Sequence, residues 1–581
     1  MSYQAPIDDI LFSLRLAAGD AAFAESGVYS DIANGVAEQT LREAEKFASA
    51  ELLPLDKSGD RIGARFMNGG VSTAPGWREA YEKWIDSGWN ALSADPHHGG
   101  MGLPLILNAA CTEVWNGANM AFSLCPLLSH GAIEALEAHA CPEIKNTYLP
   151  AIISGQWPAT MNLTEPQAGT DLALLRTRAE RASDGAYHIF GQKIYITYGE
   201  HDLSPNIVHL VLARLPDAPA GTRGISLFLV PKFLPDESGA FTRRNDVQCV
   251  GIEHKLGIHG SPTCTMSFGE KGGAIGFLIG TEHNGLACMF TMMNNARLSV
   301  GIQGVALSER ATQIATAYAR ERKQGKSLGS QATSAIIAHP DVARMLLTMA
   351  SLTAAARSIC FETAAALDFG HRDKDKSRAT ASQARASLLT PIAKAFSTDI
   401  ANEVTSLGIQ VFGGMGYIEE TGAAQLMRDA RICAIYEGTN GVQAADLVTR
   451  KLGLCEGLTL KNEIADMQAA IEDGGGDNLA KALEALTITS AFMLKALNEN
   501  PNVALAGATT YLRLFALVRA GATLRKSANL SRALKDPHAA RRALIAQFFS
   551  DHIATAAPGL AKNIMTGANT IINAQEIFNV R

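Results

Sequence analysis

The period of the hydrophobic pattern changes twice along this chain. Apolar residues recur at helical spacing from the N-terminus to about residue 155, as in the stretch from Val36 to Phe47. From about residue 158 the pattern becomes a series of short β-rich runs, among them Tyr187 to Phe190 and Ile225 to Val230. Helical spacing returns near Gly285. These changes predict a mostly helical α+β fold with a small β-domain inserted between helical segments.

The chain has 581 residues, more than one hydrophobic core usually organises, so several domains are expected. The pattern divides it into an N-terminal helical domain (1–157), a β-domain (158–280), a helical bundle (281–455) and an additional C-terminal helical domain (456–581). The charged run from His371 to Arg378 interrupts the helical pattern of the bundle. We expect it to form a solvated loop between two helices.

Charge and cysteine usage narrow the class of protein. A net charge of −6 argues against nucleic-acid binding, and no apolar run approaches the ~20 residues that a membrane span needs. Asp8 and Asp9 stand where a signal or transit peptide would carry basic residues. The nine cysteines are odd in number, scattered and never in C-x-x-C, so we expect buried thiols in a reducing compartment. The expected location is the cytoplasm.

One carboxylate, Glu437, lies in an otherwise apolar run and is followed by glycine and threonine. Because Ile435 and Tyr436 flank it, its charged form is poorly solvated, and its pKa should rise above about 4.3 toward a value suited to proton abstraction. Gly438 would let a ligand approach the backbone, and Thr439 adds a hydroxyl. The alternative interpretation is a helix end with a glycine stop after a partly buried glutamate.

Three further segments place Glu437 in a wider pattern. Met161 to Asp171 is similar to a T-E-P-x-A-G-S-D loop, and Gly191 to Gly199 is similar to a G-x-K-x-W-I-T-N-G strand. Gln410 to Tyr417 resembles a Q-x-x-G-G-x-G-Y turn. In this order and spacing, with the Glu437 segment, they make the chain resemble the flavin-dependent acyl-CoA dehydrogenases. The helical segment beyond the last motif resembles the enlarged branch that includes the 3-methylmercaptopropionyl-CoA dehydrogenases.

The resemblance implies an oxidoreductase that forms a trans-2-enoyl-CoA, with Glu437 as the base that removes the α-proton of an acyl-CoA thioester. It implies FAD as the cofactor, with flavin N5 as the hydride acceptor, because side chains cannot accept hydride. The backbone N–H of Glu437 and a flavin ribityl hydroxyl would stabilise the thioester oxygen. No G-x-G-x-x-G follows a strand, so a Rossmann mode of FAD binding is not expected.

The motifs also imply which residues hold the cofactor. Carried over by position, the FAD-binding residues are Met161, Leu163, Thr164, Tyr195, Thr197, Arg322, Gln324, Gln410, Gly413, Gly414 and Thr439. Tyr195 takes the place of the family's tryptophan and could also be an ordinary strand aromatic. Arg322 would meet the pyrophosphate, although the phenylalanine of the family's R-x-x-F-G is missing here. Gln410, Gly413 and Gly414 would approach the FAD of a neighbouring subunit, or simply break a helix.

The substrate-binding residues implied in the same way are Thr170, Asn294, Arg297, Tyr436 and Gly438. Asn294 and Arg297 correspond to the family's D-x-x-R, which grips the pantetheine of coenzyme A. Arg297 has the alternative of an exposed helix charge. No metal site is expected, because the His97–His98 and His254/His259 pairs lack further ligands at suitable spacing.

The resemblance further implies an electron-transfer flavoprotein as electron acceptor and a homo-oligomer, either a dimer or a dimer of dimers. The substrate would be 3-methylmercaptopropionyl-CoA or a short- to medium-chain acyl-CoA, in methylthiopropionate or fatty-acid metabolism. Two alternatives stay open. One is an acyl-CoA oxidase, which uses oxygen directly. The other is a DNA-associated alkylation-response flavoprotein, which would favour a basic C-terminal surface, whereas residues 456–581 hold 13 Lys and Arg against 11 Asp and Glu.

Overall fold

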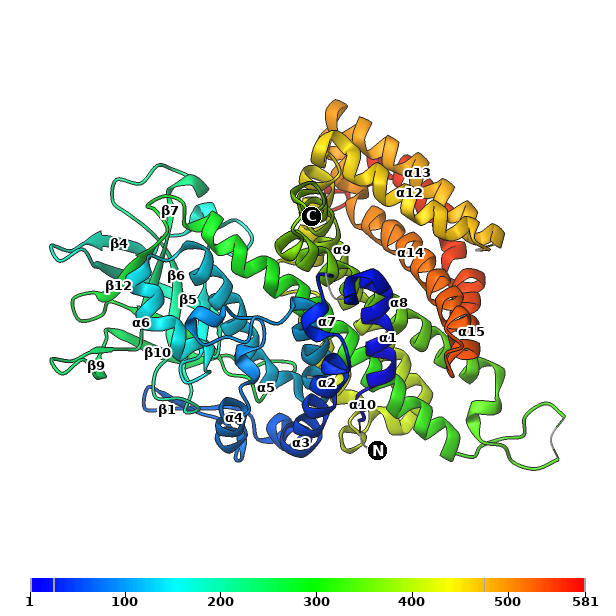
Figure 1. Ribbon diagram of the computed structural model, residues 1–581, viewed down its shortest axis with the longest axis horizontal. Helices are drawn as coiled ribbons and strands as arrows, with labels where there is room; N and C mark the ends of the chain where they lie inside the picture. Colours follow the sequence, from blue (N-terminus) through cyan, green and yellow to red (C-terminus); the bar gives the residue numbers. More distant parts are fainter. Residues whose placement is uncertain (1–2, 25–26, 330, 475, 579–581) are drawn as a thin grey trace. The chain divides into compact units, whose positions relative to one another are not determined.

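The computed structural model describes residues 3–24, 27–329, 331–474 and 476–578 (Figure 1). The chain divides into two compact units, each drawn from separate stretches of sequence. Unit 1 comprises Met1–Glu45, Leu105–Gly117 and Arg297–Arg581, and unit 2 comprises Lys46–Pro104 and Ala118–Ala296. The expected α+β, mostly helical fold class is confirmed. The four-domain division of the sequence stays a prediction.

Unit 2 contains the β-domain, whose main sheet has eight strands in the order β10-β11-β5-β12-β7-β6-β3, with β4 beside β5 and β6. Pairing is antiparallel except where β6 runs parallel to β3 and β4. These strands are β3 (Ala159–Asn162), β4 (Arg178–Arg181), β5 (Tyr187–Thr197), β6 (Val208–Arg214), β7 (Ile225–Pro231), β10 (Val247–Ile252), β11 (Thr263–Phe268) and β12 (Ala274–Ile279). Two small hairpins pair β1 (Arg65–Met67) with β2 (Gly70–Ser72), and β8 (Phe233–Pro235) with β9 (Phe241–Arg244).

Strands β6 and β7 are buried on both faces, which explains their continuous apolar runs. Leu210 of β6 and Leu229 of β7 pack into a core shared with Leu136 of α5 and Leu149 of α6. Their neighbours in the strands, including Val211, point into a second core on the other face. Alternation along each strand therefore places two hydrophobic cores against one sheet.

The remaining elements of unit 2 are helical. They are α3 (Leu53–Ile62), α4 (Trp77–Asp86) and α6 (Pro142–Ile153), together with the part of α5 (Leu105–His139) that begins at Ala118. Helices α2 (Val36–Phe47), α5 and α7 (Gly285–Glu321) each carry residues of both units. The hairpin β1–β2 was not expected from the sequence, because its strands are only three residues long and leave too short a pattern to read.

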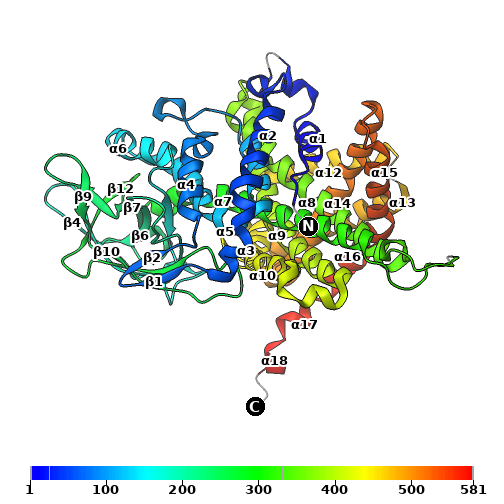
Figure 2. The same cartoon turned by 90° about the horizontal axis from the view of Figure 1, so that it is seen from below.

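Unit 1 is helical. Its helices are α1 (Ile7–Ala18), α8 (Pro340–Arg372), α9 (Lys376–Phe412), α10 (Ala423–Cys433), α11 (Asn440–Asp446), α12 (Leu458–Glu472), α13 (Gly476–Glu499), α14 (Pro501–Ala533), α15 (Ala539–Phe548), α16 (Ala557–Thr566), α17 (Ala568–Ile572) and α18 (Gln575–Phe578). Figure 2 shows α17 and α18 leading from α16 to the C-terminus. The helical periodicity expected beyond residue 456 is present.

Helix α14 is the one described helix that is long and apolar enough to cross a membrane. Its length was not apparent from the apolar pattern, because Arg513 and Arg519 interrupt that pattern. Most of its apolar stretch, 67%, is buried inside the protein, and buried residues lie on all its sides. These features are typical of the central helix of a bundle.

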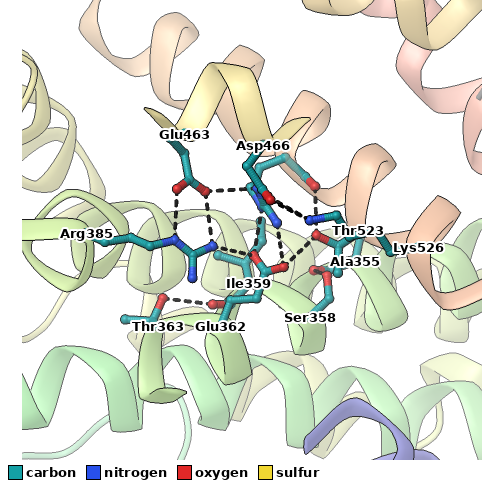
Figure 3. Close-up of polar contacts among 11 residues, drawn as sticks. Ala355, Ser358, Ile359, Glu362, Thr363, Arg385, Glu463, Asp466, Thr523 and Lys526 are labelled. Atoms are coloured by element: carbon teal, nitrogen blue, oxygen red, sulfur yellow. Dashed lines mark hydrogen bonds and ion pairs between the residues drawn. The ribbon is translucent and has the colours of Figure 1, made fainter. Parts of the chain in front are cut away.

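A buried ionic network joins α14 to three other helices (Figure 3). The guanidinium of Arg519, which is 1% exposed, reaches Glu362 of α8 at 2.7 Å and Glu463 of α12 at 3.0 Å. Around this centre the network also contains Arg385 of α9, Asp466 of α12, and Thr523 and Lys526 of α14. Three cations face three carboxylates, so the charges balance. Balanced charges in a buried site allow each ion to keep a partner.

All nine cysteines are free thiols. Seven are buried, as the sequence analysis expected, but Cys141 and Cys455 are exposed. Cys141 directly precedes α6, and Cys455 lies between unit-1 helices α11 and α12 with a left-handed backbone. Both residues lie in connections between helices, which usually run over the protein surface.

Candidate active site

Glu437 lies in the short connection between α10 and α11. Its backbone is left-handed, with φ of 55°, and Gly438 follows with φ of 83°. A left-handed conformation costs a residue other than glycine of order 1–3 kcal/mol and persists only where neighbouring groups enforce it. The connection thus presents the Glu437 carboxylate from a tight, strained turn.

Hydrogen bonds from two neighbouring elements enforce this turn. Lys394 of α9 donates its Nζ proton to the carbonyl oxygen of Gly438 at 2.9 Å. Gln443 of α11 donates from Nε2 to the carbonyl oxygens of Glu437 and Gly438, both at 3.3 Å. Thr439 caps α11 by accepting from the N–H of Val442. The glycine stop expected as an alternative is therefore part of a held turn.

The environment of Glu437 favours its protonated form. Burial raises the pKa of Glu437 to about 7, although the positive charges of Lys394 and Arg297 act to lower it. A carboxylate with this pKa is half ionised near neutral pH and matches the strength needed in a general base. The direction expected from the apolar neighbours in the sequence agrees with this environment.

The backbone N–H of Glu437 points to a second role for the turn. Among the residues that the structure describes, this N–H donates to no protein acceptor. A backbone donor left over in a tight turn is suited to bind an oxygen of a ligand. Donor and carboxylate belong to the same residue, so one ligand could engage both.

Two of the residues assigned to substrate binding, Tyr436 and Arg297, lie in or near this turn. Arg297 of α7 is buried and lies 3.6 Å from the carboxylate of Asp446, so its interpretation as an exposed helix charge is wrong. The hydroxyl of Tyr436 donates to Oε1 of Gln303, a fully buried residue of α7. Gln303 was not expected here from the sequence, because a lone glutamine in a helical run carries no distinctive pattern. Asn294 lies one turn before Arg297 on α7 and is exposed.

In unit 2, the ends of β3 and β5 bring together the first group of residues assigned to FAD. The N–H of Ile194 donates to the carbonyl oxygen of Thr164 at 2.9 Å, so the two motif segments run side by side. Met161, Thr164 and Thr197 are partly exposed there. Leu163 is buried in the core beneath them.

Tyr195 sits on a β-bulge. Cys264 of β11 pairs with Ile196 of β5, whereas Met266 pairs with Lys193, so β5 carries one extra residue. Tyr195 takes a left-handed backbone with φ of 62°, and its side chain is 60% exposed. Tyr195 thus lies in a strand, as the alternative interpretation has it, but the bulge redirects its side chain away from the regular pleat. Its contact with a flavin stays a prediction.

A buried ion pair holds these segments in place and was not identified as functional from the sequence. Lys193 donates to the Glu165 carboxylate at 2.8 Å and to the carbonyl oxygen of Leu163 at 3.0 Å. Burial alone would raise the pKa of Glu165, but Lys193 and the hydroxyl of Thr177 lower it to about 2. Both charged residues belong to the motif segments Met161–Asp171 and Gly191–Gly199, and this position in the motifs was the one sequence feature that could have indicated their role.

The second group of FAD residues lies in unit 1, at the ends of α7 and α9. Tyr318 of α7 stacks on Phe412 of α9 with ring centroids 4.3 Å apart. Arg322 and Gln324 follow the end of α7, whereas Gln410 lies in the last turn of α9. Gly413 and Gly414 come directly after α9, so this motif does end a helix. Arg322, Gln324, Gln410, Gly413 and Gly414 are all exposed, as is Thr170 in unit 2.

The chain matches four family models over most of its length. Three describe acyl-CoA dehydrogenases: the N-terminal domain at residues 37–156, the middle domain at 160–270 and the C-terminal domain at 283–452. The fourth is described as acetyl-CoA dehydrogenase C-terminal like and covers residues 461–575.

In the described parts of the chain, no group of three or more His, Cys, Asp or Glu is placed to hold a metal ion.

The proteins to which this chain is similar include several acyl-CoA dehydrogenases. The chain is 46% identical over 526 residues to 3-methylmercaptopropionyl-CoA dehydrogenase of Ruegeria pomeroyi, covering 88% of this chain and 89% of that one. It is 37% identical over 436 residues to a butyryl-CoA dehydrogenase of Syntrophomonas wolfei, covering 73% and 71%. In fold it is similar to an acyl-CoA dehydrogenase of Bacillus anthracis complexed with FAD, with a TM-score of 0.75, 20% identity, and coverage of 98% and 95%.

Proposed function

Because the chain belongs to the acyl-CoA dehydrogenase family, we propose that it oxidises an acyl-CoA thioester to the trans-2-enoyl-CoA with FAD as cofactor and Glu437 as base. The observation that carries this proposal is the Glu437 turn. Its carboxylate has a pKa of about 7, and its backbone N–H has no protein acceptor among the described residues. These two groups suit removal of an α-proton and stabilisation of the thioester oxygen.

The residues at the ends of β3 and β5 fit a flavin. The exposed aromatic ring of Tyr195 and the partly exposed hydroxyls of Thr164 and Thr197 offer stacking and hydrogen bonding beside two adjacent backbone segments. FAD, when bound, supplies the hydride acceptor that side chains lack. The proposed FAD-binding residues are Met161, Leu163, Thr164, Tyr195, Thr197, Arg322, Gln324 and Thr439, with Gln410, Gly413 and Gly414 serving a neighbouring subunit.

The protein's own groups perform the proton chemistry. The Glu437 carboxylate takes the α-proton, and its own N–H donates to the thioester oxygen as negative charge develops there. Tyr436 and Gly438 border the reacting carbons, while Thr170, Asn294 and Arg297 bind the coenzyme A part of the thioester. Since Gly438 has φ of 83° and its carbonyl is held by Lys394, the backbone there is rigid before substrate binds.

We propose 3-methylmercaptopropionyl-CoA or a short- to medium-chain acyl-CoA as substrate, and an electron-transfer flavoprotein as electron acceptor. The similarity to the Ruegeria and Syntrophomonas dehydrogenases over most of the chain supports this substrate range. An acyl-CoA oxidase is the alternative that Glu437 also fits. A DNA-associated flavoprotein is less well supported, because residues 456–581 carry 13 Lys and Arg against 11 Asp and Glu.

The direct test is flavin reduction by thioesters under anaerobic conditions. The FAD-loaded protein is mixed with 3-methylmercaptopropionyl-CoA and with straight-chain acyl-CoAs of increasing length, and flavin absorbance is followed. We expect at least one of these thioesters to reduce the flavin. Because the pKa of Glu437 is about 7, the second-order rate of reduction should fall about tenfold per pH unit below that pH.

Two outcomes would change the assignment. If none of the thioesters reduces the flavin at any pH, the proposed reaction is wrong. If air rapidly reoxidises the reduced enzyme and yields hydrogen peroxide, the protein is an oxidase. For the proposed reaction the rate should approach a plateau above pH 8, where most Glu437 carboxyls are ionised.

We further propose a homo-oligomer, dimer or dimer of dimers, in which Gly414 approaches a neighbour's FAD. A Cβ atom added at Gly414 meets nothing within 4 Å of its own chain, so Gly414→Leu should not disturb the subunit fold. We expect this variant to lose bound FAD by about tenfold in affinity or more. Gly559→Leu is the matched control, because the same open space surrounds Gly559 of α16.

Light scattering gives the assembly and flavin absorbance gives the FAD content of both variants. A wild-type protein that is monomeric and still holds one FAD per chain would contradict the shared site. Equal FAD retention by Gly414→Leu and Gly559→Leu would contradict it as well.

A further inference from the structure

Lys394 occupies a buried position, where a charged side chain costs free energy of desolvation. It lies in the middle of α9 and is completely buried. Burial lowers its pKa to about 8, although Cys433, Glu437 and Asp399 favour its charged form. A buried ammonium group loses its hydration and is retained only where protein acceptors replace water.

The two acceptors of Lys394 lie in the turn that carries Glu437 and at the start of α11. Its Nζ donates to the carbonyl oxygen of Gly438 at 2.9 Å and to Oδ1 of Asn440 at 3.0 Å. Asn440 in turn donates from Nδ2 to Asp399 at 2.7 Å and to the carbonyl oxygen of Ala395 at 3.1 Å. The turn is thus tied to α9 at Gly438 and at Asn440, the first residue of α11.

Helix α9 is a rigid support at this point. A Cβ atom added at Gly304 of α7 would lie 2.5 Å from the carbonyl oxygen of Ser397, and one at Gly301 would lie 3.0 Å from that of Ala393. The backbones of α7 and α9 are therefore in close contact on either side of Lys394. Lys394 therefore extends from a closely packed helix backbone, and its hydrogen bonds restrain the turn.

We propose that Lys394 is a positioning residue that holds the Glu437 turn in its left-handed conformation and places a positive charge behind the catalytic carboxylate. This inference rests on the proposed role of Glu437 as base. Lys394 touches neither substrate nor cofactor in this assignment, and it acts through the carbonyl of Gly438. Two consecutive left-handed residues need such an anchor, because Glu437 alone disfavours that backbone.

The charged groups around Glu437 predict the sign of the effect. Lys394 on α9 and Arg297 on α7 both lower the pKa of Glu437 and oppose the effect of its burial. Asp446 pairs with Arg297, and Asp399 and Cys433 face Lys394. Removing Lys394 leaves burial opposed by Arg297 alone, so the pKa of Glu437 should rise above about 7.

The test replaces Lys394 by methionine, which keeps the length of the chain and removes the charge and the three donors. Lys394→Arg keeps a charge and donors, and Lys481→Met removes an exposed lysine of α13 as the matched control. Two measurements are made on FAD-loaded protein. One is the pH dependence of flavin reduction by the best thioester, and the other is amide hydrogen exchange of residues 435–443.

For Lys394→Met we expect the acidic limb of the pH profile to move to higher pH by about one unit or more. We also expect exchange of residues 435–443 to accelerate at least ~10-fold, since the carbonyl oxygen of Gly438 loses its donor on α9 and, with that of Glu437, keeps only the hydrogen bonds from Gln443. Lys394→Arg should restore both toward wild type, and Lys481→Met should match wild type. If Lys394→Met does not fold, Lys394→Gln provides the same neutralisation with two donors kept, and the same shift of the limb is expected.

An unshifted limb or unchanged exchange in the neutral variant would overturn this inference. Failure of the proposed function has a different signature, because the wild-type flavin would then be reduced by no thioester. Exchange of residues 435–443 still reports on the anchor in that case, since it requires no turnover.

Discussion

Replacement of Glu437 by glutamine should leave FAD and thioester binding intact and slow flavin reduction by at least ~10²-fold, the lower range for loss of a general base. Glutamine is nearly isosteric and keeps the backbone N–H, but its amide cannot accept the α-proton. The limb near pH 7 should disappear from any residual rate, because that limb belongs to the Glu437 carboxyl. Rapid mixing under anaerobic conditions measures both effects.

Glu484→Gln is the matched control for this prediction, since Glu484 is an exposed carboxylate of α13 outside the candidate site. It should behave as wild type in FAD content, thioester affinity and rate. Should Glu437→Gln keep most of its rate while Glu484→Gln is normal, another carboxylate is the base. Loss of thioester binding together with the rate would instead show that the side chain holds the substrate.

Four of the eight strands of the main sheet, β5, β6, β7 and β11, could be predicted from their β-rich runs. The signal was clearest where a continuous apolar run marks a strand that is buried on both faces. Ile225 to Val230 was expected as a strand and forms β7. The bulge at Tyr195 could not be predicted. It depends on pairing between β5 and β11, and a local sequence window contains no information about a partner strand.

Helix boundaries were less accessible where charged residues dominate. The run from His371 to Arg378 was expected to be a loop, but only residues 373–375 lie outside α8 and α9. Asp375 accepts from the N–H groups of Ser377 and Arg378, and this cap starts α9 earlier than the apolar pattern does. In the sequence, polar residues of a first helical turn have the same pattern as loop residues, because the capping hydrogen bonds form only in the folded structure.

For the candidate site, the sequence pointed to the proposed base but not to the residues that hold it in place. Glu437 could be found because apolar neighbours surround it in the chain. Lys394 could not, because its partners Gly438 and Asn440 are far along the sequence and come together only through packing of α9 against the turn. A lone lysine in the apolar run from Pro391 to Phe396 was the available signal.

Removing Arg519 from the buried ionic network should strongly destabilise the folded protein. Arg519→Met removes one of three cations and leaves Glu362 and Glu463 buried with too little positive charge. Breaking a buried ion pair on one side typically costs about 3–5 kcal/mol. We therefore expect a lowered melting temperature and faster hydrogen exchange in α12 and α14. Arg532→Met, on the exposed end of the same helix, should change stability by no more than about 0.5 kcal/mol.

A double variant separates charge from shape. Glu362→Met combined with Arg519→Met restores the balance, since two cations then face two carboxylates in the remaining network. We expect it to recover a large part of the stability that the single variant loses, because apolar pairs of similar volume can replace buried ion pairs. Equal losses in the single and double variants would contradict the charge argument.

Because Arg519 binds α8 and α12, this network attaches residues 456–581 to the bundle that carries Glu437. Truncation after Leu454 should accordingly yield insoluble protein, whereas a soluble, FAD-loaded truncated chain would show that the bundle folds without the C-terminal helices.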